Sequence, residues 1–134
     1  MPLALARPVA MVATKDRKVA EAFYGRALGL ERKGEDGFAA LFDLAGVTLR
    51  LTEVPGYSAP PHPVLGWEVP DIEAAVDALA ANGVAMNLYE GLGQDDRGIW
   101  TAPDGSFKVA FFSDPDGNGL SLTQILSAGR AATG

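Results

Sequence analysis

The chain carries an internal repeat, and the two copies end in nearly the same strand-like sequence. Residues 49–54 read Leu-Arg-Leu-Thr-Glu-Val and residues 120–125 read Leu-Ser-Leu-Thr-Gln-Ile. Each copy opens with a short apolar segment and continues through Asp16 or Asp71 into an alanine-rich stretch that stops at a glycine. Repetition of one supersecondary unit predicts two copies of the same module. We expect these modules to share a cavity between them.

The first module begins with a strand–helix pattern. Residues 8–14 are short, apolar and rich in valine and alanine, which favours a strand. Asp16 is a typical N-cap residue, and Gly29 stands where a helix often ends in the left-handed conformation. The spacing predicts a helix between them whose buried face is formed by Val19, Phe23 and Ala27.

The remaining elements follow from turn signals and apolar runs. Residues 31–37 are mostly charged and predict a short exposed strand, and a hairpin at Ala45-Gly46 joins strands over 38–44 and 47–54. In the second module a helix begins after Asp71 and buries Ile72, Val76 and Leu79. The predicted strands of the second module are residues 64–69, 84–89, 106–112 and 119–125.

Four prolines between residues 55 and 63 indicate a linker. The predicted organisation is a single domain over 1–134, made of modules 7–55 and 63–126, with a flexible tail at 127–134. Each module reads as one strand, one helix and about three further strands, with neighbours in sequence pairing antiparallel. The predicted fold class is α+β.

Composition narrows the classes of function. The net charge of −6 repels phosphate backbones and anionic lipids, so we expect neither nucleic acid nor a membrane as partner. The chain has no cysteine, which excludes disulfides and thiolate chemistry, and its single histidine, His62, limits metal sites. The first residues lack the features of a secretory signal, and no apolar run has membrane-spanning length. We therefore expect a cytoplasmic protein.

Two segments carry a resemblance to a known family. Residues 16–30, with Phe23-Tyr24 and Leu28-Gly29-Leu30, and residues 111–118, Phe-Phe-Ser-Asp-Pro-Asp-Gly-Asn, resemble the vicinal oxygen chelate superfamily. This group includes glyoxalase I, extradiol dioxygenases and bleomycin resistance proteins. The resemblance covers about residues 8–126 and implies paired βαβββ modules whose mixed sheet curls around a cup. It also implies a homodimer and leaves the activity open, because one scaffold hosts several functions.

The resemblance also locates four positions where enzymes of the superfamily place His or Glu as metal ligands. They fall on Val9 and Arg50 in the first module and on Val64 and Ser121 in the second. Valine has no lone pair, and the guanidinium of arginine donates hydrogen bonds but does not accept them. Divalent ions in such sites need imidazole or carboxylate donors. We therefore expect no metal and no other cofactor.

If these four positions face the cup, strand alternation brings further side chains to the same side. The leucines of the closing strands, together with Trp67, then face the helices. The cup is expected to be mainly apolar with a few polar points, as small-molecule sites are. The residues expected to contact a ligand are Met11, Arg50, Glu68, Trp100, Phe107, Val109, Phe111, Ser121 and Thr123.

Several of these residues allow two interpretations. Arg50 could bind a ligand carboxylate or phosphate, or form a salt bridge to Glu68, or extend into solvent. Glu68 and His62 are the candidate general bases. Alternatively, Glu68 is a carboxylate at the rim of the cup and His62 is a solvated histidine in a loop. Trp100 could stack on an aromatic ligand or anchor a loop. Tyr24 is expected to pack in the core.

Three functions fit the sequence. The first is a metal-free binding protein that encloses a small aromatic or anionic molecule, similar to bleomycin resistance proteins. The second is a glyoxalase-like lyase or extradiol-type dioxygenase whose metal ligands are displaced. The third is metal-independent catalysis, with Glu68 or His62 as base and Arg50 stabilising an oxyanion. Because its usual metal ligands are missing, we favour a binding protein over an enzyme.

Overall fold

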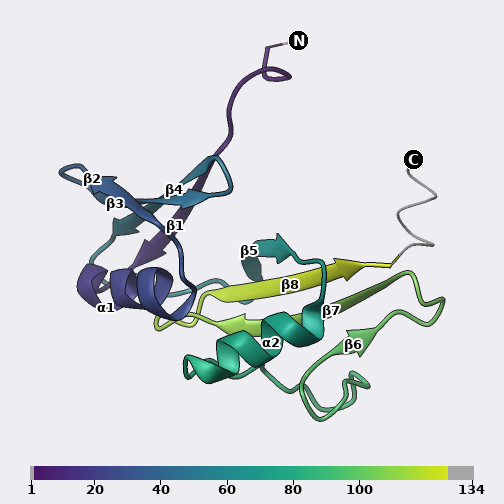
Figure 1. The fold of residues 1–134 in the computed structure, drawn as a ribbon. Helices are drawn as coiled ribbons and strands as arrows, with labels where there is room; N and C mark the ends of the chain where they lie inside the picture. Colours follow the sequence, from purple (N-terminus) through teal and green to yellow (C-terminus); the bar gives the residue numbers. More distant parts are fainter. Residues whose placement is uncertain (1, 127–134) are drawn as a thin grey trace. The chain divides into compact units, whose positions relative to one another are not determined.

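A computed structural model describes residues 2–126 of the chain (Figure 1). Its contacts divide the chain into two compact units, which join in sequence at Ala59 and Pro60. Each unit contains a four-stranded mixed sheet and one helical segment, in the order strand, helix, three strands. The predicted α+β class with two βαβββ modules is therefore confirmed. The predicted tail at 127–134 lies outside the described residues.

In the first unit the strand order is β1-β4-β3-β2. β1 runs parallel to β4, and the pairs β2–β3 and β3–β4 are antiparallel. The elements are β1 (Val9–Thr14), α1 (Arg17–Ala22), a π-helical turn η1 (Phe23–Ala27), β2 (Arg32–Glu35), β3 (Ala39–Leu44) and β4 (Val47–Glu53).

The helical segment of this unit differs from the prediction. Ala20 and Tyr24 are completely buried, whereas Val19 is half exposed, so the buried row lies one residue after the predicted one. Apolar residues occupy both rows, and spacing alone does not separate them. After Ala22 the backbone widens to i→i+5 bonding, with Leu28 N–H donating to Phe23 O at 3.0 Å. The expected core role of Tyr24 is confirmed.

In the second unit the strand order β5-β8-β7-β6 repeats the plan, again with one parallel pair, β5–β8. α2 packs against β7 and β8 and buries Ile72 and Val76, as predicted. The elements are β5 (Pro63–Glu68), α2 (Ile72–Ala81), β6 (Trp100–Thr101), β7 (Phe107–Ser113) and β8 (Gly119–Ile125).

The prediction of a strand over 84–89 is wrong. This segment keeps one ladder-like bond, from Asn87 N–H to Phe111 O at 2.7 Å, and the edge strand β6 forms instead at Trp100–Thr101. The side chain of Gln94 replaces the ladder, because it donates to Asn87 O and Gly98 O and accepts from Tyr89 N–H. Hydrogen bonds from one side chain to several backbone groups produce no periodic pattern in the sequence. They give residues 87–99 a defined loop conformation.

The internal repeat is visible in how the two helices begin. Asp16 accepts from Val19 N–H at 3.3 Å and Asp71 accepts from Ala74 N–H at 3.2 Å. A side chain from the end of each closing strand binds the first amide of the helix: Glu53 Oε1 accepts from Arg17 N–H and Gln124 Oε1 from Ile72 N–H, both at 2.9 Å. The similar strand sequences thus serve the same purpose, since the first amides of a helix lack intrahelical partners.

The predicted hairpin at Ala45-Gly46 is also found. Ala45 and Gly46 both have positive φ angles, 51° and 95°, which matches the twist that a two-residue hairpin needs. In the turn at 114–118 the buried Asp114 carboxylate accepts from the backbone N–H groups of Asp116 and Asn118, each at 2.9 Å. Asn118 Nδ2 donates to the same carboxylate at 2.8 Å. The family-like Asp-Pro-Asp-Gly-Asn segment therefore has a structural role.

Candidate functional site

Strand register assigns every predicted ligand-contacting residue to a sheet face. In the first sheet Leu49 and Leu51 are buried on the helix side, while Arg50 pairs with Met11 and Leu41 on the other side. We call that side the Arg50 face. It carries Val9 and Met11, which are more than half exposed, along with Thr48 and Thr52.

The second sheet is sorted in the same way. Leu120, Leu122, Ala110 and Phe112 are buried on the side of α2, and Trp67 stacks on Phe112 there with ring centroids 6.2 Å apart. The other side, which we call the aromatic face, is built from three aromatic rings with a few polar groups. Its members are Glu68, Trp100, Phe107, Val109, Phe111, Ser121 and Thr123.

The aromatic face is continuous across three strands. Trp100 pairs with Val109, and its indole lies 5.7 Å from the ring of Phe107. Phe111 pairs with Ser121, whose hydroxyl lies against Gly66. A β-carbon at Gly66 would lie 2.4 Å from Ser121 Oγ, so glycine makes room for the serine side chain. The seven residues predicted to contact a ligand in the second module thus share one face.

Arg50 is not free to bind a ligand. Its Nη1 lies 2.8 Å from Asp36 Oδ2, in the same unit. The hydrogen bond from Arg50, together with the backbone amides of Phe38 and Ala39, lowers the pKa of Asp36 to about 2. A salt bridge to Glu68 was one of the alternatives for Arg50, and the ion pair that the structure shows is with Asp36. Asp36 was missed because it lies in a turn whose charges looked like a solvated strand.

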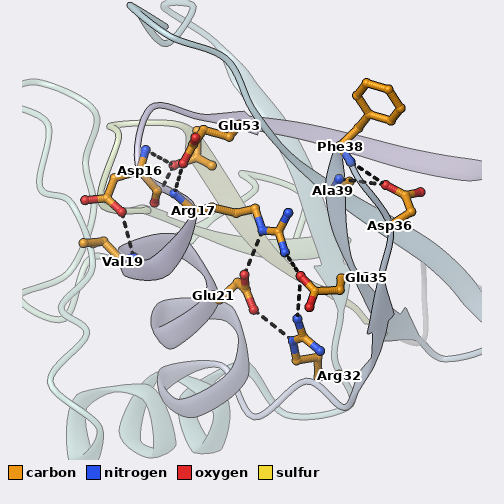
Figure 2. A network of polar contacts seen from close by, with 11 residues as sticks. Asp16, Arg17, Val19, Glu21, Arg32, Glu35, Asp36, Phe38, Ala39 and Glu53 are labelled. Carbon is orange, nitrogen blue, oxygen red and sulfur yellow. Dashed lines mark hydrogen bonds and ion pairs between the residues drawn. The ribbon is translucent and has the colours of Figure 1, made fainter.

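A second charged cluster in the first unit joins α1 to β2 (Figure 2). Glu21 accepts from Arg17 Nε at 2.9 Å and from Arg32 Nε at 2.8 Å, and Arg17 also pairs with Glu35. Burial raises the pKa of Glu21, but the hydrogen bonds from the two arginines outweigh it, so the net shift is downward. Because each charge has a partner, this cluster is structural.

The second unit has a pocket at the end of the aromatic face. Its volume is about 230 Å³, and it contains Phe111, Tyr89, Ser113 and His62. We call it the Phe111 pocket. Prolines and glycines form the rest of its wall: Pro60, Pro61, Pro63, Gly117 and Gly119. An adjoining hollow of about 460 Å³ shares Pro61, Pro63, Tyr89 and Phe111 and adds Glu90, Gly91 and Leu92.

The candidate bases lie at different places. Glu68 is exposed at the end of β5, opposite Thr123. His62 is exposed at the wall of the Phe111 pocket, with Nδ1 3.1 Å from the carbonyl oxygen of Pro63. A carbonyl only accepts, so Nδ1 carries the hydrogen and Nε2 of the neutral ring offers a lone pair. His62 can therefore accept a hydrogen bond or a proton from a molecule in the pocket.

Three polar residues at or beside the Phe111 pocket were not predicted from the sequence: Asn87, Tyr89 and Ser113. Ser113 could have been found, because alternation along β7 places it on the same side as Phe111. Tyr89 depends on the 87–99 loop and approaches Phe111 edge to face, with the ring centroids 6.1 Å apart.

The residues at the four metal positions do not suit a divalent ion. Val9 and Val64 offer no donor, Arg50 is a cation bound to Asp36, and Ser121 offers only a hydroxyl. Within residues 2–126 no group of three or more His, Asp or Glu side chains is close enough together to hold a metal ion. None of the helices described is long and apolar enough to cross a membrane.

Comparison with known proteins agrees with this architecture. Residues 7–122 match the model of the Glyoxalase/Bleomycin resistance protein/Dioxygenase superfamily. The chain therefore belongs to this superfamily. None of the curated proteins compared with the chain matches it.

Solved structures with similar folds come from several bacteria. A mutant of the genomically encoded fosfomycin resistance protein from Listeria monocytogenes, complexed with Mn(II) and 1S,2S-dihydroxypropylphosphonic acid, is 15% identical with a TM-score of 0.72, and 98% of each chain is covered. A glyoxalase family protein from Enterococcus faecalis is 22% identical with a TM-score of 0.70, covering 92% of this chain and 99% of that one. A lactoylglutathione lyase from Agrobacterium tumefaciens is 21% identical with a TM-score of 0.61, covering 90% and 93%. At these identities the likeness concerns the fold.

Proposed function

We propose that this chain is a metal-independent binding protein of its superfamily that holds a small neutral aromatic molecule on the aromatic face of the second unit. The observation that carries the proposal is the alignment of Trp100, Phe107 and Phe111 on one face, ending in the Phe111 pocket. Aromatic rings provide large apolar contact areas and favour edge or offset stacking with a ligand ring. A mostly apolar surface with a few polar groups is typical of small-molecule sites.

Charge favours a neutral ligand over an anionic one. Arg50 was the candidate anion receptor, but its guanidinium is already bound to Asp36. Within the described part of the chain no lysine or arginine lines the two hollows at Phe111, and the second hollow includes Glu90. Since the whole chain has a net charge of −6, the protein would repel an anionic molecule electrostatically.

The side chains at the metal positions support operation without a metal. The Listeria relative is described with Mn(II), and hard divalent ions of this kind bind through carboxylate and imidazole groups. At the four positions located by the family resemblance, this chain has two valines, a paired arginine and a serine. We therefore propose that ligand binding depends on rings and hydrogen bonds alone.

Freshly purified protein, analysed by native mass spectrometry with parallel elemental analysis, tests this proposal. We expect the mass of a homodimer, no stoichiometric transition metal, and retention of any bound molecule as a neutral aromatic species. About one divalent ion per chain would overturn the proposal and favour a glyoxalase-like or dioxygenase-like metalloenzyme with displaced ligands.

A further inference from the structure

Two hydroxyl groups in the wall of the Phe111 pocket are held by one side-chain amide. They lie outside the set of residues that forms the aromatic face. Asn87 Nδ2 donates to Ser113 Oγ at 2.9 Å and to Tyr89 Oη at 3.3 Å. Both hydroxyl oxygens belong to residues that line the pocket. Because they share one nitrogen, the two groups converge on the same part of its wall.

The backbone of Asn87, whose side chain organises this pair, is fixed on both sides. Asn87 N–H donates to Phe111 O at 2.7 Å, and Asn87 O accepts from Gln94 Nε2 at 3.0 Å. Gln94 also binds Gly98 O and Tyr89 N–H, so the loop holds Tyr89 in place. The hydroxyl pair is therefore preorganised, which reduces the entropic cost of binding.

The hydrogen-bond inventory shows what the pair can offer. The two hydrogens of Asn87 Nδ2 are used by Ser113 and Tyr89, and each hydroxyl accepts one of them. Each hydroxyl keeps its own proton, and within residues 2–126 no acceptor receives either one. The pocket wall thus presents two O–H donors next to the ring of Phe111.

We propose, as an extension that rests on the proposed function, that the ligand is a neutral aromatic carbonyl compound. A carbonyl oxygen has two lone pairs and no proton, and so it complements two convergent O–H donors. A carboxylate would suit the donors equally well, but among residues 2–126 no lysine or arginine lines the pocket to balance its charge. The volume of about 230 Å³ limits the aromatic part to one or two fused rings, since it lies below the roughly 300–1,000 Å³ of drug-sized sites.

Equilibrium dialysis with three matched probes tests this inference. The probes are 2-acetylnaphthalene, 2-isopropenylnaphthalene, which replaces the carbonyl oxygen by CH₂, and the 2-naphthoate anion. We expect the ketone to bind the wild-type protein most tightly. Ser113→Ala and Tyr89→Phe should each weaken ketone binding by roughly three- to tenfold while leaving hydrocarbon binding unchanged, since each removes one neutral hydrogen bond.

A matched control and separate outcomes keep the two proposals distinct. Ser58→Ala removes an exposed hydroxyl outside the pocket and should change no affinity. Equal binding of ketone and hydrocarbon, or tightest binding of naphthoate, would overturn the carbonyl inference; equal ketone and hydrocarbon binding would leave aromatic binding intact. Failure of all three probes to bind would overturn the proposed function together with the inference.

Discussion

The two units share one plan and differ in the face that each presents. Both have the same strand order and the same double capping of their helix, by an aspartate and by the last polar residue of the closing strand. On the helix side the closing strands keep leucines at equivalent positions. On the opposite side Arg50 is replaced by Ser121 and Leu41 by Phe111. Packing against the helix therefore constrains one face of a duplicated sheet and leaves the other face free to change.

The specialisation also shows in how polar groups are used. In the first unit charges neutralise one another, as Arg50 does with Asp36 and Arg17 with Glu21. In the second unit the Phe111 pocket contains hydroxyl groups and an imidazole beside aromatic rings. This difference is the reason why the proposed ligand site lies in the second unit, whereas the charged clusters of the first unit join its own elements.

The largest expected effect comes from removing the ring that joins the aromatic face to the pocket. Phe111→Ala should weaken binding of 2-acetylnaphthalene by about tenfold to a hundredfold, because apolar area and ring stacking are lost together. Leu41→Ala changes the equivalent position of the first unit and should leave the affinity within about twofold of the wild-type value, since no ligand contact is lost. Equal losses in the two variants would break the comparison. Equilibrium dialysis measures both.

The next largest expected effect is on stability, from adding a side chain at Gly119, the first residue of β8. A β-carbon at Gly119 would lie 3.0 Å from Pro63 Cα, whereas the equivalent position of the first unit accommodates Thr48. Gly119→Ala should lower the free energy of unfolding by about 1–3 kcal/mol, because backbone atoms of β5 must move. Thr48→Ala is the matched control and should cost less. Urea denaturation measures both, and an unchanged midpoint for Gly119→Ala would contradict this account.

The paired helix caps should show a smaller, duplicated effect. Glu53→Ala and Gln124→Ala each remove a 2.9 Å hydrogen bond to the first amide of a helix. Each should cost about 1 kcal/mol of unfolding free energy. Urea denaturation measures both. A clear loss of unfolding free energy in one variant and none in the other would show that the two caps, although repeated in sequence, do not contribute equally to stability.

The smallest effect concerns the pH dependence of the first unit. The pKa of Asp36 falls from 3.8 to about 2 in the folded chain, chiefly through the hydrogen bond from Arg50. A carboxyl group whose pKa is lower in the folded chain stabilises the fold at pH values above its pKa in the unfolded chain. For Asp36 this stabilisation is lost as the pH falls from about 4 through about 2. Asp36→Asn should therefore flatten the loss of stability in this interval. Carboxylate NMR should show the titration of Asp36 moving upward in Arg50→Gln, and an unmoved titration would contradict the assignment.

Much of this architecture could be predicted from local signals. Alternation along the closing strands placed Arg50 and Ser121 away from the helices, and Asp16 and Asp71 marked where the helices begin. The glycine at position 46 predicted the hairpin, and in the structure it has the positive φ angle that such a turn needs. These features depend on residues close in sequence, where backbone geometry limits the choices.

The rest depends on contacts that no short pattern encodes. The two apolar rows of α1 differ by one residue, and only packing on the sheet buries Tyr24 in place of Val19. The 87–99 loop is organised by the side chain of Gln94, and through it Tyr89 reaches the Phe111 pocket. The partner of Arg50 is decided by a turn that brings Asp36 within 2.8 Å. Such long-range choices require the folded chain.

Metal-independent binding by the aromatic face is tested by measuring the affinity of the purified chain for 2-acetylnaphthalene before and after exhaustive treatment with EDTA. We expect saturable binding with the same dissociation constant in both samples, and no gain in affinity on adding Mn²⁺ or Zn²⁺. Binding that disappears with EDTA and returns with either metal would contradict metal-independent recognition by the aromatic face, and so would an absence of binding in every sample.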